Sequence, residues 1–190
     1  LTTHPSLEHS SVFSPAGDKV AFVANYEGAS EVYVMPISGG IAQRVTYENS
    51  TVKLHQWHAK GIVFSTNSRV GPTGSWVLKT VQPETLRTET IPLSDAVEGR
   101  FDAPGTQMFF TQFGLQMSSD NANQYQGGAS GQIWRFDLDD PDEAVGLTAS
   151  HTGSVREPMV ADDRIFFVSN QSGLDNIWSM SKEGSDKQQI

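Results

Sequence analysis

The feature that most constrains the fold is a set of four short apolar runs that can be laid over one another. These runs are KVAF, GIVF, QMFF and RIFF, which close on Phe22, Phe64, Phe110 and Phe167. The unit therefore recurs about every 40 to 60 residues, and self-similarity at such a period is typical of repeat architectures.

Each repeat contains three further runs around this one. A first run closes on Phe13, Trp57, Phe101 and Val160, and a turn (SPAGDK, HAKG, DAPGTQ, ADDR) joins it to the second. A third run is centred on Tyr33, Val77, Trp134 and Trp178, and a weaker fourth one reads IAQRVT, RTETIPL, EAVGLT and DKQQI. The runs are rich in β-branched and aromatic residues and none shows a long 3.6-residue period, so all are predicted to be strands.

Four strands repeated at this period predict an all-β fold, a β-propeller of four-stranded antiparallel blades. A four-stranded sheet is too small to bury both faces alone, so blades stack around an axis. We expect blades over approximately 3–46, 51–93, 95–148 and 152–190, with each first strand lining a central channel and each fourth strand at the rim. Leu1-Thr2 match Val45-Thr46, which suggests that the chain begins on the end of a preceding blade. The interpretation is one partial propeller, about four blades of a six-bladed one.

Charge and composition exclude several classes of partner. Thirteen Lys and Arg face 22 Asp and Glu, for a formal charge of −9, which opposes nonspecific binding to nucleic acid or an anionic membrane. The chain has no cysteine, so disulfides, thiol catalysis and cysteine-ligated zinc are excluded. No apolar run has the length of a membrane helix. Localisation stays open between cytoplasm and periplasm.

The glycine-rich string YQGGASGQIW, from Tyr125 to Trp134, raises the question of a phosphate cradle or a nucleophile turn. A P-loop requires a lysine that is missing here, and a nucleophile elbow requires a glycine two residues after Ser130, where Gln132 stands. The spacing of the glycines also differs from the dinucleotide fingerprint, and a strand follows them. We therefore expect residues 113–131 to form a long irregular insertion that returns to its blade at Ile133, with Tyr125 and Gln126 offering loop contacts.

Other candidate chemistry is equally weak. The acidic run from Asp137 to Glu143 has Asp142 where an EF-hand needs glycine. His55 and His58 are three apart on a predicted strand, which puts them on opposite faces unless a bulge intervenes. We therefore expect no catalytic residue, no cofactor and no metal ligand. The aromatic residues expected in the core are Phe13, Phe22, Trp57, Phe64, Phe101, Phe110, Phe167 and Trp178.

The run GDKVAFVANYEGASEVYVMPISGGIAQRVT resembles the repeat of the TolB and tricorn propellers, and the string around Tyr125 is similar to one in the amino-terminal propeller of tricorn proteases. The insertion is basic in that family, whereas Gln126, Ala129 and Gln132 are neutral here. The resemblance implies a non-catalytic propeller of a serine peptidase that governs passage of peptides, with peptides or other domains of the parent peptidase as partners; a homo-oligomer is compatible with it.

Two alternatives stay open: a TolB-like scaffold for protein interaction, and the gating propeller of a prolyl-oligopeptidase-like enzyme. In each case, peptide or protein contacts are expected along the first strands of the blades. The candidate channel residues are His9, His55, Arg100 and Arg156.

Overall fold

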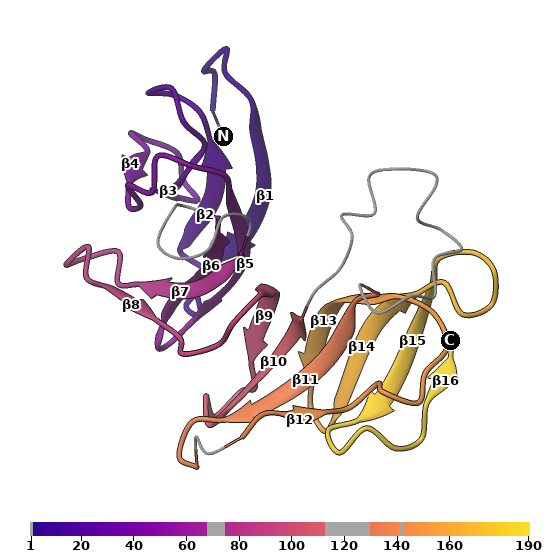
Figure 1. Cartoon of the computed structure of the whole chain (residues 1–190). Coiled ribbons are helices and arrows are strands. Elements are labelled where there is room, and N and C mark those ends of the chain that lie inside the picture. Colours follow the sequence, from indigo (N-terminus) through magenta and orange to yellow (C-terminus); the bar gives the residue numbers. More distant parts are fainter. Residues whose placement is uncertain (1, 68–74, 113–129, 141–142) are drawn as a thin grey trace. The chain divides into compact units, whose positions relative to one another are not determined.

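The computed structural model describes residues 2–67, 75–112, 130–140 and 143–190, and every regular element in them is a β-strand (Figure 1). The sixteen strands form four antiparallel sheets. The chain divides into two compact units, Leu1–Ser94 and Asp95–Ile190, each with two sheets. Each sheet keeps its four strands in chain order, as expected for propeller blades.

In the first unit, blade one consists of β1 (Glu8–Phe13), β2 (Lys19–Ala24), β3 (Glu31–Pro36) and β4 (Gln43–Arg44). Blade two consists of β5 (Val52–His58), β6 (Gly61–Thr66), β7 (Val77–Val81) and β8 (Thr88–Thr90).

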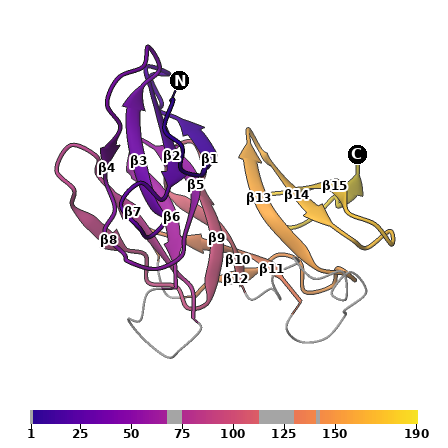
Figure 2. The ribbon, with the colours of Figure 1, turned by 90° about the horizontal axis from the view of Figure 1, so that it is seen from above.

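In the second unit, blade three consists of β9 (Ala96–Phe101), β10 (Gln107–Gln112), β11 (Gln132–Asp137) and β12 (Val145–Gly146). Blade four consists of β13 (Val155–Ala161), β14 (Arg164–Ser169), β15 (Asn176–Ser181) and β16 (Gln188–Gln189). Figure 2 shows β13, β14 and β15 side by side from above.

Strand register confirms the predicted repeat. The four second-strand phenylalanines are all buried and occupy equivalent places on β2, β6, β10 and β14. Their partners on the third strands are Tyr33, Lys79, Trp134 and Trp178. The predicted centre of the third run in blade two was wrong by two residues, because Lys79 rather than Val77 lies opposite Phe64.

All four first strands contain an irregularity. The register shifts by one residue in β1, β5, β9 and β13, which is the pattern of a β-bulge. In blades one and four the bulge contains a residue with left-handed backbone, Ser10 (φ 55°) and Glu157 (φ 54°). A bulge bends its strand and redirects side chains, so the first strand of each blade is shaped differently from the other three.

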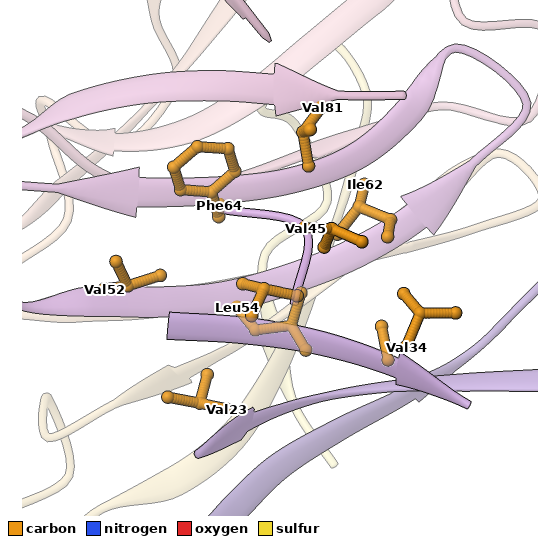
Figure 3. Packing of buried hydrophobic residues seen from close by; sticks show 10 residues of the cluster. Val23, Val34, Val45, Val52, Leu54, Ile62, Phe64 and Val81 are labelled. Carbon is orange, nitrogen blue, oxygen red and sulfur yellow. The ribbon is translucent and has the colours of Figure 1, made fainter. Parts of the chain in front are cut away.

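The core lies between neighbouring blades of each unit. Between blades one and two the buried side chains interleave as Figure 3 shows: Ala21, Val23, Val32, Val34 and Val45 on one side, and Val52, Leu54, Ile62, Phe64 and Val81 on the other. Between blades three and four the buried side chains are Phe109, Ile133, Leu147, Val155, Ile165, Phe167 and Met180. Burial of one such side chain contributes about 1.5 to 3 kcal/mol, so blade stacking supplies the main hydrophobic stabilisation of each unit.

One residue predicted for the core is exposed, and so is one residue whose equivalent in another blade is buried. Phe13, which we expected in the core, is 66% exposed, whereas its equivalent in blade three, Phe101, is buried. On the last blade Ile177 is 50% exposed, although its equivalent Ile133 is fully buried. Position in the repeat therefore does not fix burial, because burial requires a blade packed against the face concerned.

Candidate functional site

The first strands of neighbouring blades lie against one another, β1 with β5 and β9 with β13 (Figure 1). In the part of the chain that the structure describes, the fourth strands of the same blades make no comparable contact. First strands that converge while fourth strands diverge are what a radial arrangement requires, with the first strand innermost. The candidate site therefore consists of side chains on the inner strands.

The predicted site residues fall into three groups. His9 is exposed on β1, and His55 is buried on β5. Arg100 on β9 and Arg156 on β13 are both half-buried in the second unit, where their strands are adjacent. Tyr125, Gln126 and almost all of the predicted insertion lie outside the described residues.

The imidazole of His55 is engaged with a neighbouring strand. Its Nε2 lies 2.8 Å from Oγ of Ser65, which has no exposed surface. His55 is the extra residue of the β5 bulge, between Leu54, which pairs with Phe64, and Gln56. The sequence argument about opposite faces assumed a regular strand, and the bulge removes that assumption. Even so, no group of three or more potential metal ligands is found among the described residues.

A second buried histidine–serine pair exists in blade four. His151 Nε2 lies 2.8 Å from Oγ of Ser169, and the imidazole meets the rings of Phe167 and Trp178 edge-on, with centroids 5.7 and 5.1 Å away. Burial, aided by the positive charge of Lys187, lowers the pKa of His151. A nucleophile must meet its substrate, and the serine oxygens of both pairs have no exposed surface. These pairs are therefore structural hydrogen bonds within the core.

Arg156 is held by a carboxylate on the β14–β15 turn. Its two terminal nitrogens donate to Oδ1 and Oδ2 of Asp175 at 3.2 and 2.8 Å. This two-point pairing raises the pKa of Arg156 and lowers that of Asp175. The contact fixes the guanidinium of Arg156 beside the inner strand.

Glu98 connects the inner strands of blades three and four. Its Oε2 accepts a hydrogen bond from the backbone N–H of Glu157 at 2.6 Å and one from Oγ1 of Thr111 at 3.1 Å. Glu157 is the left-handed residue of the β13 bulge. The bulge turns a backbone donor away from its own sheet, and a carboxylate of the neighbouring blade satisfies that donor.

Arg100 differs from Arg156 in that no carboxylate of the described residues pairs with its guanidinium at two points. Burial lowers its pKa, and the charges of Glu157 and Glu98 only partly oppose this effect. Across residues 2–67, 75–112, 130–140 and 143–190, no hydrogen bond or ion pair of its guanidinium is found. Sequence reasoning identified the two arginines but missed Glu98, Glu157 and Asp175, because only the bulge and the adjacent turn bring these carboxylates to the inner strands.

Gly131 explains part of the glycine-rich string. A Cβ at this position would lie 2.3 Å from the carbonyl oxygen of Val155, so no side chain fits there. The carbonyl of Gly131 accepts from the N–H of Val155 at 3.1 Å. Its N–H donates to Oγ of Ser154 at 3.2 Å. This glycine allows the backbones of blades three and four to meet.

Taken together, the four-stranded blades and the bulged inner strands define a β-propeller domain with polar and charged groups on its inner strands. The chain belongs to the family described as Tricorn protease N-terminal beta propeller domain, whose model matches residues 1–190. It is 30% identical over 179 residues to Tricorn protease homolog 1 of Streptomyces coelicolor. That match covers 91% of this chain but 16% of the relative, so the chain spans about a sixth of that protein.

Solved structures show the same fold. The crystal structure of the tricorn protease superposes with a TM-score of 0.79 at 18% identity, covering 99% of this chain and 19% of that one. TolB from Acinetobacter baumannii gives a TM-score of 0.71 at 17% identity, covering 92% of this chain and 41% of that one. The family is thus shown by sequence and the blade architecture by structure. Among the described residues, no helix is long and apolar enough to cross a membrane.

Proposed function

We propose that this domain is a non-catalytic propeller of a tricorn-type serine peptidase and that its inner strands contact peptides on their way to or from an active site in other domains. The observation that carries the proposal is the match to the tricorn propeller family along the entire chain. The relative in Streptomyces coelicolor is named as a protease homolog, and it is several times longer than this chain. The remaining length offers room for a catalytic region.

The character of the inner strands supports the same function. A surface along which peptides of different sequence pass should offer hydrogen bonds but no deep apolar pocket that would hold one ligand tightly. In the second unit that surface consists of the half-buried arginines on β9 and β13 and the carboxylates around them. A TolB-like scaffold shares the fold, but the family match favours the peptidase assignment. We also expect that Ser130→Ala changes no hydrolysis, because Ser130 is not part of a nucleophile turn.

The test uses the full-length protein with any cysteine outside these 190 residues replaced, because the 190 residues themselves contain none. A His9→Cys variant, which places the thiol on the exposed inner strand β1, is labelled with a bulky maleimide polymer. We expect labelling to slow cleavage of long peptides more than cleavage of a short fluorogenic substrate. The control is Glu89→Cys on β8, a fourth strand, labelled in the same way. Equal rates for the two labelled variants on long peptides would contradict the proposal.

A further inference from the structure

We propose that Arg100 and Glu157 together form a recognition site for the main-chain amide groups of peptides, between the inner strands of blades three and four. This inference rests on the proposed function and names the chemistry by which the inner strands would contact their cargo. It assigns Arg100 as the donor to peptide carbonyls and the Glu157 carboxylate as the acceptor for peptide N–H groups.

Arg100 carries a guanidinium whose donors are not engaged within the described part of the chain. It is half-buried on β9, and none of its N–H groups is engaged by any residue that the structure describes. Burial without a partner is costly, and the lowered pKa of Arg100 reflects this incomplete compensation. Arg156, on the adjacent strand, shows the contrasting case, because Asp175 satisfies its guanidinium at two points. An acceptor from a bound ligand would satisfy the donors of Arg100 in the way that Asp175 satisfies those of Arg156.

Glu157 supplies the complementary acceptor. Its backbone N–H is taken by Glu98, which fixes the residue in the bulge, while 61% of its side chain is exposed. The Arg156 Nε atom lies 4.0 Å from Oε1 of Glu157, at the limit of an ion pair, and Arg156 already has its stronger partner in Asp175. The carboxylate is therefore positioned by its backbone and still able to accept a hydrogen bond.

The local charge decides between classes of ligand. The two arginines face three carboxylates, those of Glu98, Glu157 and Asp175. A surplus of negative charge does not favour a phosphate or an acidic side chain, although a lone arginine would. A ligand that offers an acceptor and a donor close together fits both groups, and the peptide unit is such a ligand. Recognition through the main chain would accept peptides of different sequence.

The experiment measures peptide binding by the full-length protein. The probe is a Gly/Ala/Ser peptide with acetylated and amidated ends and a benzophenone photo-crosslinker, so that it carries no charge. Arg100→Gln is expected to weaken its binding about tenfold, the size of a lost hydrogen bond to a charged group. Crosslinks should map to β9 and β13. Glu157→Gln should weaken binding less, because an amide oxygen can still accept.

Controls separate this inference from the proposed function. Arg87→Gln, an exposed arginine paired with Glu89, should leave binding unchanged. Arg100→Lys keeps the charge but loses the planar fork, so its peptide affinity should lie between those of the unmodified protein and Arg100→Gln. If Arg100→Gln lowers the thermal midpoint, the affinity of Arg100→Lys is the measurement that tests the inference. Unchanged peptide binding by the Arg100 variants would overturn the inference but leave the proposed function standing. Tighter binding of an acidic probe than of the neutral probe would have the same consequence. Failure of the unmodified protein to bind any peptide overturns both.

Discussion

Phe167 allows the packing between blades to be measured with a matched control. It is fully buried between blades three and four, where it packs with Phe109, Ile133 and the ring of His151. Truncation to alanine removes the ring from a site bounded by two sheets, which cannot collapse freely. Phenylalanine-to-alanine changes in such sites cost about 3 to 5 kcal/mol. We expect a loss in that range for Phe167→Ala.

The control is Phe13→Ala in the same 190-residue chain. Phe13 closes the first strand of blade one, but 66% of it is exposed, so its truncation should cost less than about 1 kcal/mol. The assay is urea unfolding followed by tryptophan fluorescence, with the free energy of unfolding taken from midpoint and slope. Equal losses for the two variants would refute the argument that burial between two blades, and not loss of the ring as such, determines the cost of the truncation.

Three further predictions concern polar and backbone features. Glu31 is fully buried and accepts hydrogen bonds from Arg44, Thr46 and the N–H of Asn49. In urea unfolding, Glu31→Ala should therefore cost about 3 kcal/mol, because these donors are left unsatisfied. Glu27→Ala, which removes an exposed ion pair with Arg44, should cost less than about 1 kcal/mol. Gly131→Ala should lower the thermal midpoint clearly more than Gly146→Ala, since only the first places a Cβ against a carbonyl oxygen, and equal shifts would contradict the close backbone approach. The lowered pKa of His151 means that the unfolded chain takes up a proton before the folded one, so stability should fall as pH drops below about 6.5 towards the folded-state pKa. A smaller loss between pH 7.5 and 5.5 in His151→Gln would support this, and an identical loss would count against it.

The fold could be predicted from the sequence because the repeat consists of apolar residues at equivalent strand positions, which the folded sheets bury. The second-strand phenylalanines share one register, and the turns SPAGDK and DAPGTQ adopt matching geometry. In both turns a glycine with φ of 72° donates to the residue three positions earlier, Gly17 to Ser14 and Gly105 to Asp102. Local chemistry and global pattern agree at these places, which is the condition under which sequence reasoning succeeds.

The site was less predictable, because it depends on irregularities that leave little trace in the sequence. Nothing in the run VREPMVA shows that Glu157 takes a left-handed conformation, and Asp175 lies nearly twenty residues from the arginine it binds. The two arginines were named from the sequence because they lie on or next to predicted first strands. The carboxylates were missed, since acidic residues are common throughout.

The bulges give the four blades unequal inner strands although their second strands share one register. In blade two the bulge buries His55 against Ser65, and in blade four it presents Glu157 to the carboxylate of Glu98. An extra residue in the first strand changes which groups face the neighbouring blade but leaves the second strand, and therefore the hydrophobic core, in place. The repeat can thus hold the core constant while each inner strand carries different chemistry. Variation in what a propeller of this family contacts is therefore expected to concentrate at positions such as 10, 55 and 157, where substitution alters contacts without disturbing the buried phenylalanines.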